Sequence, residues 1–349
     1  MSESTSETEQ VGNAFAAMLS TVIGSPVAMA AQPEKLRGGF WAQIWGVELT
    51  AAPAPFDRPM VLRVMPDQRG GLREAVVQQA IADHGFRTPR VFASGVAPGL
   101  GASYIVMERI NGHTPLGGLR LGPELLALPR LLRRLPSILA TTMSALHALN
   151  PDFMRAAVAD AGAALPAPVH PFRSIIENAD AECPPAGFAE FIRWLDEHAP
   201  TPGADVICHG DLHPLNILID HQGMAWLLDW TNATTGPKEM DIGFTAGLLR
   251  CAPIAVPKPL RPIVQRITNR LAESFIQAVA TTAVVDRPAV DWWEALQHGR
   301  CLAQVAHGRL HADDVVSANH PFEASVEAMR RRLHKLTGAM ITPPPRVFV

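Results

Sequence analysis

The sequence predicts an α+β fold with two lobes, a small β-rich lobe over residues 34–110 and a larger, mainly helical lobe over residues 111–340. The chain has 349 residues, which exceeds the length of a single domain of about 150 residues. Short apolar runs typical of strands dominate before residue 110, and long helical stretches follow Gly112. Hydrophobic residues form 48% of the chain, which is enough for a sizeable core.

Residues 1–33 are expected to form an acidic tail followed by a short helix over 11–23 that packs on the body. The region from Gln10 to Pro33 has no charged residue, but polar residues and Pro26 interrupt it. Three glutamates precede it, where a signal peptide would have basic residues. We therefore expect no membrane span and a cytoplasmic protein. The proline-rich residues 341–349 are expected to form a flexible tail.

The small lobe is expected to contain mostly strands and one helix. Gly70 and Gly71 open the predicted helix, which ends at Gly85, and Pro66 closes the strand before it. The predicted elements are a strand-like run within 36–50, a strand over 60–65, a helix over 70–85, a strand or loop over 90–97 and a strand over 103–107.

The large lobe is expected to contain mostly helices. A long apolar stretch over 125–149 predicts a helix broken near Pro129 and Pro136, and the proline- and alanine-rich residues 150–185 are expected to be irregular. The other predicted elements are a helix over 188–198, two strands around a turn within 206–230, and helices over 241–250, 262–284, 290–311 and 320–336.

Composition excludes several classes of function. Thirty basic residues stand against 33 acidic ones, for a net charge of −3, so no basic excess exists to neutralise nucleic-acid phosphates. The four cysteines include no CxxC pair, which argues against disulfides and a structural zinc site. We expect them to be small buried apolar side chains.

The segment 206–229 carries the most informative pattern. A polar loop leads into a strand over 217–220, a turn over 221–223 and a second strand over 224–228. Asn216 precedes the first strand and Asp229 ends the second, so an antiparallel hairpin can bring these side chains together. Amide and carboxylate oxygens suit Mg²⁺ better than zinc. Asp211, five residues before Asn216, has the position of a base that accepts a proton from a substrate hydroxyl.

The run from His209 to Asn216, HGDLHPLN, followed by Leu228-Asp229-Trp230, resembles the catalytic core of the aminoglycoside phosphotransferase and choline kinase-like family. The resemblance implies a bilobal protein-kinase-like fold, with Asp211 as catalytic base and Asn216 and Asp229 as Mg²⁺ ligands. It also implies that His209 supports the loop, and that Asp241 anchors it without taking part in catalysis.

The small lobe resembles the same family, and the resemblance covers roughly residues 34–250. Val61 to Val64 looks like the strand that bears the phosphate-holding residue, and the next helix looks like the one that supplies a glutamate partner. We predict an ion pair between Arg63 and Glu74. The residues implied to hold the nucleotide are Gly38 and Gly39 of the phosphate-covering loop, Arg63, Glu74, and the interlobe hinge residues Met107, Glu108 and Ile110.

Two residues depart from the family pattern. Arg63 stands where a kinase has lysine, which keeps the charge but changes the geometry of the donors. Thr231, two residues after Asp229, stands where an acidic side chain is common. Any second metal ion would therefore depend on Asp229 and Asn216.

Three functions remain open at the level of sequence. The first is a phosphotransferase that moves the γ-phosphate of ATP or GTP to a hydroxyl of a small molecule, with Mg²⁺ bound. The second is a metallohydrolase that uses the HxDxH run His209, Asp211 and His213. The third is a nucleotide-binding regulator, which would normally have lost Asp211 or Asp229. The oligomeric state is open.

The acceptor is expected to bind the large lobe, against residues 150–200 and the helices after 260. Acidic residues there are scattered, whereas a polycationic aminoglycoside would favour an acidic cleft. Aromatic residues give a slight preference for a lipophilic alcohol. These are Phe188, Trp194, Trp292 and Trp293.

Overall fold

The structure is a computed structural model that describes residues 2–36, 42–97, 102–115, 128–254, 256–311 and 321–345. The chain forms two compact units, and both are discontinuous in sequence. The first unit comprises Met1–Gly117, Asp152–Ala164 and Leu215–Thr231, and the second comprises the remaining segments. This grouping differs from the continuous segments expected from sequence, because the hairpin after the polar loop and residues 152–164 belong to the same unit as the N-terminal sheet.

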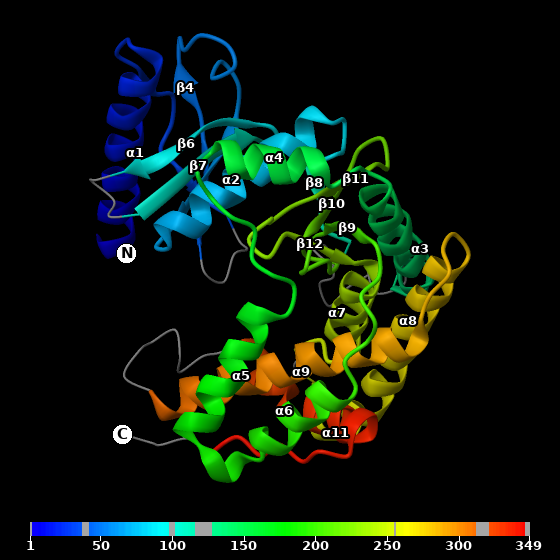
Figure 1. Ribbon diagram of the computed structural model, residues 1–349. Coiled ribbons are helices and arrows are strands. Elements are labelled where there is room, and N and C mark those ends of the chain that lie inside the picture. The colour runs from blue at the N-terminus through cyan, green and yellow to red at the C-terminus, as the bar shows by residue number, and fades with distance from the viewer. Residues whose placement is uncertain are drawn as a thin grey trace. The chain divides into compact units, whose positions relative to one another are not determined.

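A five-stranded antiparallel sheet forms the centre of the first unit, with strand order β2-β3-β5-β7-β6 (Figure 1). Two smaller sheets, β1-β4 and β11-β10-β8, complete the unit. Its elements are α1 (Ser2–Ile23), β1 (Ala28–Met29), β2 (Glu34–Lys35), β3 (Gln43–Val47), β4 (Leu49–Thr50), β5 (Met60–Met65), α2 (Gln68–Asp83), β6 (Val91–Ala97), β7 (Ala102–Glu108), β8 (Gly112–His113), α4 (Asp152–Asp160), β10 (Ile217–Asp220) and β11 (Ala225–Leu227).

The two faces of the five-stranded sheet are covered by different helices. Side chains alternate along a strand, so Met60, Leu62 and Val64 of β5 share one face. They pack in one core cluster with Phe15 and Leu19 of α1. The N-terminal helix therefore forms part of the core of this unit.

The opposite face of the sheet packs against α2. Met65 of β5 and Ile105 of β7 form a cluster there with Ala75 of α2. Asp67 caps α2 by accepting a hydrogen bond from the Gly70 N–H, 3.0 Å long. Arg63 lies between Leu62 and Val64 in β5, so the strand alternation directs it to this face.

The hairpin β10-β11 belongs to the first unit through three connections. Its first strand pairs with β8, in the register Ile219↔His113. The Leu227 N–H donates to the carbonyl of Arg87, 2.9 Å away, and the buried indole of Trp230 donates to the Thr88 hydroxyl, 2.8 Å away. The hairpin is thereby fixed to the loop that follows α2.

The second unit is mainly helical (Figure 1). Its one described sheet pairs β9 with β12 in an antiparallel register. Its elements are α3 (Leu128–His147), α5 (His170–Glu182), η3 (Pro184–Ala186), α6 (Phe188–Glu197), β9 (Asp205–Cys208), β12 (Thr234–Pro237), α7 (Lys238–Arg250), η4 (Lys258–Leu260), α8 (Arg261–Ala280), α9 (Arg287–Leu310), η5 (Pro321–Ser325) and α11 (Val326–Thr337).

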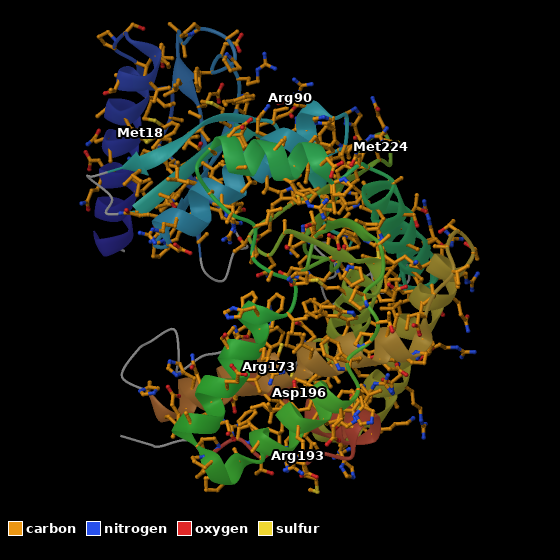
Figure 2. All side chains as sticks on the ribbon, in the orientation of Figure 1. Met18, Arg90, Arg173, Arg193, Asp196 and Met224 are labelled. Carbon is orange, nitrogen blue, oxygen red and sulfur yellow. The ribbon has the colours of Figure 1, made fainter. Side chains whose placement is uncertain are left out.

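Helix α9 runs through the core of the second unit and is buried over most of its length. Helix α7 approaches it closely at Gly243, where a Cβ would lie 2.7 Å from the Val290 carbonyl oxygen. Asp286 caps α9 by accepting a hydrogen bond from the Ala289 N–H. At the surface, Arg173 of α5 binds Asp196 of α6, and Figure 2 labels both side chains.

A buried charge cluster lies inside this helical core. The Glu294 carboxylate of α9 is fully buried and accepts two hydrogen bonds from the Arg332 guanidinium, 2.7 and 2.8 Å long. The Nε atom of Arg250 lies 2.9 Å from the same carboxylate, and His298 Nε2 lies 3.4 Å from it. Burial raises the pKa of Glu294, but the hydrogen bonds from Arg332 and His298 outweigh burial and hold that pKa well below its usual value.

Most of the predicted elements are present. The strand over 60–65, the helix after Asp67, the hairpin around residues 221–223 and the four C-terminal helical segments all form close to their predicted bounds. No helix within the described ranges is long and apolar enough to cross a lipid bilayer.

Three local predictions were wrong. The acidic residues at the N-terminus belong to α1, which begins at Ser2 instead of residue 11. Residues 150–185 contain the helices α4 and α5, because the prolines lie before, between or after these helices, except Pro171, which lies in the first turn of α5, where proline is tolerated. Helix α3 continues through Pro136, and its contact with α8 offsets the lost hydrogen bond.

We predict that Glu294→Gln destabilises the protein by about 3–5 kcal/mol, because Arg250 and Arg332 lose the fully buried carboxylate that they share and keep only their more exposed partners, Glu273 and Asp291. Urea unfolding followed by circular dichroism measures the change. The folded-state pKa of Glu294 is depressed. Its contribution to the free energy of unfolding is therefore fully present above the pKa of the unfolded state, about 4.3. That contribution is lost as the pH falls through the folded-state pKa.

The matched control is Glu327→Gln, which removes an exposed partner of Arg330 and Arg331 on α11. It should cost no more than about 1 kcal/mol. Equal losses in the two variants would contradict the role given to Glu294.

Candidate active site

Arg63 is the centre of a network of polar side chains in the first unit. Its guanidinium donates to both carboxylate oxygens of Asp229, over 3.0 and 2.9 Å. Its Nε atom lies 3.4 Å from Glu74 Oε1, and the predicted ion pair between Arg63 and Glu74 is therefore present. The network joins a strand, a helix and the residue that follows the hairpin.

The network is a set of charges removed from water. Arg63 and Glu74 are 7% and 1% exposed. Burial alone would lower the pKa of Arg63, but the Glu74 and Asp229 carboxylates outweigh it and raise that pKa. Burial raises the pKa of Glu74 to about 7, against the opposing effect of Arg63. Arg63 is therefore a permanent cation held between two carboxyl groups.

Thr231 completes this network. Its hydroxyl lies 2.9 Å from Glu74 Oε2 and 2.7 Å from Asp229 Oδ1, and it accepts a hydrogen bond from Arg63 over 3.1 Å. A hydroxyl has a single hydrogen, so it donates to one carboxylate at a time. Thr231 thus joins the two carboxylates without adding a negative charge.

The backbone at Asp229 is unusual. Its φ angle is 64°, in the left-handed region that non-glycine residues seldom adopt, although aspartate tolerates it better than most. The buried Trp230 that follows is fixed by its bond to Thr88 and by edge-on packing against Phe86. Strained backbone of this kind concentrates at functional sites, where the surroundings hold it in place.

Asn216 lies at the other end of the hairpin. The Leu228 N–H donates to the Asn216 carbonyl over 2.9 Å, so Asn216 is opposite the residue that precedes Asp229. The Asp220 carboxylate closes the turn by accepting hydrogen bonds from the backbone of Met224 and the indole of Trp226, each 2.9 Å long. The register of the hairpin therefore places an amide residue and a carboxylate residue at neighbouring strand ends.

The polar loop over 209–214 lies in the second unit and is anchored by a buried carboxylate. Asp241 accepts hydrogen bonds from the backbone N–H groups of His209 and Gly210, over 2.9 and 2.7 Å. Gly210 has a φ angle of 74°, and a Cβ there would lie 2.6 Å from the Asn232 carbonyl oxygen. The loop conformation therefore requires glycine at this position.

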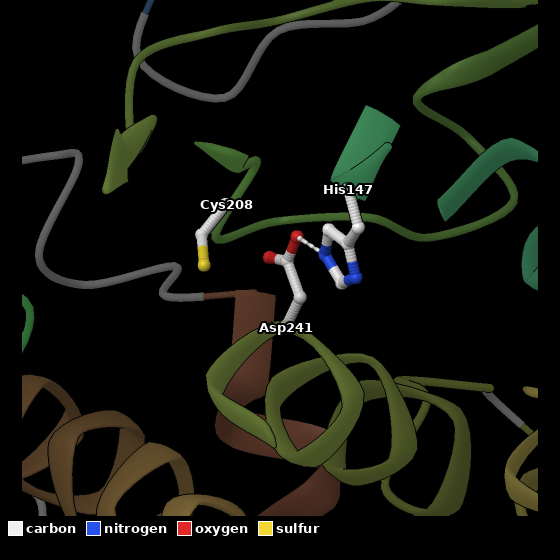
Figure 3. A group of neighbouring side chains, drawn as sticks. All are labelled: His147, Cys208 and Asp241. Carbon is white, nitrogen blue, oxygen red and sulfur yellow. Dashed lines mark hydrogen bonds and ion pairs between the residues drawn. The ribbon is translucent and has the colours of Figure 1, made fainter. Parts of the chain in front are cut away.

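The same carboxylate contacts His147 of α3, as Figure 3 shows. His147 Nε2 lies 2.9 Å from Asp241 Oδ2. Burial would raise the pKa of Asp241, but the hydrogen bond from His147 and the backbone donors hold it below its usual value. Cys208 lies beside this pair, and burial raises the pKa of its thiol well above the usual range. The Cys208 sulfur lies 3.5 Å from the carbonyls of Gly236 and Pro237 and can donate to one of them at a time, so the thiol also takes part in holding the loop.

Asp211 follows the anchored dipeptide. Its backbone N–H donates to His209 Nδ1 over 3.2 Å, and its carboxylate lies 3.7 Å from His213 Nε2. His209 is fully buried, whereas the side chains of Asp211 and His213 are about one quarter exposed. Within the described residues, the two groups with convergent ligand atoms for a metal do not include His209, Asp211 and His213. The geometry gives no support to the metallohydrolase set.

The remaining nucleotide-binding candidates lie elsewhere. Gly38 and Gly39 fall outside the described residues. Met107 is buried, and its sulfur accepts a hydrogen bond from Gln78. Glu108, at the end of β7, lies 3.4 Å from the Arg90 N–H, and Ile110 is half-buried just beyond the strand. No hydrogen bond in the described part of the chain joins these three residues to Arg63.

Two contributors to the site were not expected from sequence. Thr231 was noted only because it is not acidic, although a hydroxyl two residues after the metal-ligand candidate was a usable signal. The other is His147, whose contact with Asp241, 94 positions away, has no local signature in the sequence.

The arrangement divides chemical capability between the units. The first unit holds hard oxygen donors and a buried guanidinium suited to phosphate. The second unit holds a carboxylate on a rigid loop, where it can accept a proton.

Comparison with solved structures shows the same fold. A candidate aminoglycoside phosphotransferase from Ralstonia eutropha JMP134 matches with a TM-score of 0.60 at 16% identity, over 94% of this chain and 98% of that one. Aminoglycoside phosphotransferase APH(4)-Ia, solved with ADP and hygromycin B, matches with a TM-score of 0.57 at 17% identity, over 93% and 97%. Macrolide 2'-phosphotransferase type I matches with a TM-score of 0.53 at 18% identity, over 94% and 97%.

Sequence comparison gives one further relative and a family. The uncharacterized protein YcbJ of Bacillus subtilis strain 168 is 46% identical over 50 residues, which span 14% of this chain and only 16% of that protein. The model of the phosphotransferase enzyme family matches residues 47–293, well over half of the chain. The fold is the α+β arrangement that the resemblance implied, an antiparallel sheet followed by a mainly helical part, and the chain belongs to the phosphotransferase enzyme family.

Proposed function

We propose that this protein transfers the γ-phosphate of ATP or GTP to a hydroxyl of a small molecule, in a Mg²⁺-dependent reaction. The observation that carries the proposal is the network in which Arg63 joins Asp229 and Glu74, on a chain that also has Asp211 in a fixed loop. Structures of similar fold include one with ADP and one with AMP-PNP, each together with hygromycin B. These ligands support nucleotide use here.

The donor set suits a magnesium ion. Asn216 and Asp229 offer an amide oxygen and a carboxylate, which are hard ligands. Thr231 supplies a hydroxyl beside them and not a thiol or an imidazole, so a softer metal has no advantage at this position. Held by Asn216 and Asp229, Mg²⁺ would neutralise charge on the nucleotide phosphates.

Arg63 has the charge and the donors for the nucleotide phosphates. Its guanidinium presents a planar fork that matches phosphate oxygens, which the ammonium of lysine lacks. Both terminal nitrogens of this guanidinium donate to Asp229, so phosphate oxygens would replace these bonds, while Glu74 holds the Nε side of Arg63 and Thr231 orients Asp229. Preorganised charge of this kind can contribute most of the catalysis in phosphoryl transfer.

Asp211 is the proposed base. It accepts the proton of the acceptor hydroxyl as the oxygen attacks phosphorus. The bonds from Asp241 to the loop backbone hold Asp211 in place, because they fix the two residues before it. His213, 3.7 Å from the Asp211 carboxylate, adds a polar neighbour that helps to orient it.

The acceptor is proposed to bind residues of the second unit, which carries Asp211. The aromatic residues that suggested a lipophilic alcohol do not support that preference. Phe188, Trp292 and Trp293 are buried in the core cluster, and Trp194 packs against it. Aminoglycosides, macrolides and other alcohols are therefore equal candidates in a screen of ATP and GTP consumption.

We predict that Asp211→Asn lowers kcat about 10²–10⁴-fold with any acceptor that reacts, because the base is lost and the shape is kept. Initial-rate kinetics measure the loss, and thermal unfolding checks that the fold is intact. The control Asp160→Asn changes an exposed carboxylate of α4 and should keep wild-type activity. Turnover near that of the wild type in Asp211→Asn would remove the base assignment.

We predict that Asp229→Ala abolishes the dependence of nucleotide binding on Mg²⁺, because the carboxylate ligand is lost. Calorimetric titration with AMP-PNP, with and without Mg²⁺, measures the coupling. Asp57→Ala, which removes an exposed partner of Arg58, should retain it. If Asp229→Ala keeps the full coupling, the metal is held elsewhere.

We predict that Thr231→Val lowers kcat/KM about 10-fold, roughly 1.4 kcal/mol, because the hydroxyl no longer orients Asp229 against Glu74. Thr231→Ser keeps the hydroxyl and should restore most of the activity. A positioning role predicts a larger change in kcat than in the KM for nucleotide. Equal activity of the valine and serine variants would show that the hydroxyl is dispensable.

A further inference from the structure

A second cluster of ligating side chains lies on the surface of the second unit, apart from the residues used above. Glu182 is the last residue of α5, and His307 and His311 lie in the last turn and at the C-cap of α9. Their ligand atoms all lie within 4.8 Å of one another. The proposed phosphoryl transfer uses none of them.

The backbone explains why these side chains meet. Residues four apart on a helix lie on the same face, one turn above the other, so His307 and His311 point the same way. Their rings are 4.4 Å apart between centroids. Helix α5 packs on α9 and ends with Glu182 beside both rings.

The ligand atoms lie close enough for small shifts of the side chains to place them around one tetrahedral metal ion. His307 Nδ1 and His311 Nε2 lie 2.9 and 3.5 Å from Glu182 Oε2. Ligand atoms at about 2.1 Å from a zinc ion in tetrahedral geometry are roughly 3.4 Å apart. Both imidazole side chains are more than half exposed, at 56% and 55%, so an ion reaches the site directly and water can complete the coordination.

The local charge also favours a cation. Two helices end here, and each C-terminus carries a partial negative charge from its unpaired carbonyl groups. The last turn of α5 contains no basic residue, and the other basic residue in the last turn of α9, Arg309, is bound to Glu323.

We propose that Glu182, His307 and His311 form a surface site for one divalent transition-metal ion, with Zn²⁺ as the preferred ion. Imidazole nitrogens with one carboxylate oxygen suit zinc, whereas Mg²⁺ prefers an all-oxygen set. The bound ion joins the C-terminal ends of α5 and α9 in the unit that carries Asp211. This site is separate from the proposed magnesium site, and its test does not depend on phosphotransferase activity.

The test is calorimetric titration of the chelator-treated full chain with Zn²⁺. We expect binding of one ion per chain, at least about tenfold weaker in His307→Ala, in His311→Ala and in the nearly isosteric Glu182→Gln. Zinc should also raise the Tm of the wild type, and it should raise the Tm of the three variants by a smaller amount. Co²⁺ in place of zinc should show ligand-field bands without the intense band of a thiolate ligand.

Two control variants make the result specific. His221→Ala removes an exposed histidine in the turn of the hairpin, and Cys183→Ser removes the thiol next to Glu182. Both should bind zinc as the wild type does. The proposal is overturned if the wild type binds no zinc stoichiometrically, if the three ligand variants bind it unchanged, or if either control loses it.

Discussion

The charge on Arg63 is the constraint on which the first unit depends. A guanidinium that is almost fully buried requires carboxylates, and it finds them on two segments distant in sequence, Glu74 of α2 and Asp229 after the hairpin. Removing either partner would leave the buried guanidinium with a single carboxylate, and removing both would leave a buried charge uncompensated. The need to neutralise Arg63 therefore fixes the sheet, the helix and the hairpin against one another.

The second unit has a corresponding anchor in Asp241. Its buried carboxylate binds two backbone N–H groups of the polar loop and the His147 ring. Hydrogen bonds to the charged form keep the carboxylate ionised despite burial. In both units, residues with catalytic potential thus lie on backbone held by buried charges, while the carboxylates of Asp229 and Asp211 are partly exposed.

The sequence predicted the parts of this site that local patterns determine. The apolar run of β5 and the turn after Asp220 predict the strand and the hairpin, and the resemblance to the family singles out Arg63, Glu74 and Asp229, with Asp241 as an anchor. The sequence did not predict the long-range contacts. The bond between His147 and Asp241 depends on how α3 packs, and nothing near either residue in the sequence specifies it.

The errors in secondary structure have the same origin. Pro136 lies within α3, where propensity alone predicts a break, because packing on α8 stabilises the helix. The acidic residues of α1 form a helix because Phe15 and Leu19, further along the same helix, bury their side chains against the sheet. Burying one large apolar side chain stabilises the folded state by roughly 1.5–3 kcal/mol. A few such side chains therefore outweigh local propensity.

On the proposed function, the Arg63 network also bears on how the metal ion binds. Asp229 is already paired with a guanidinium through two hydrogen bonds, and the third polar neighbour, Thr231, is a hydroxyl without charge. A divalent ion on its own would therefore meet a site with little net negative charge and a nearby cation. Phosphate oxygens change this balance, because they give Arg63 an alternative partner and bring negative charge of their own. The geometry therefore favours magnesium that arrives with the nucleotide over magnesium that binds first.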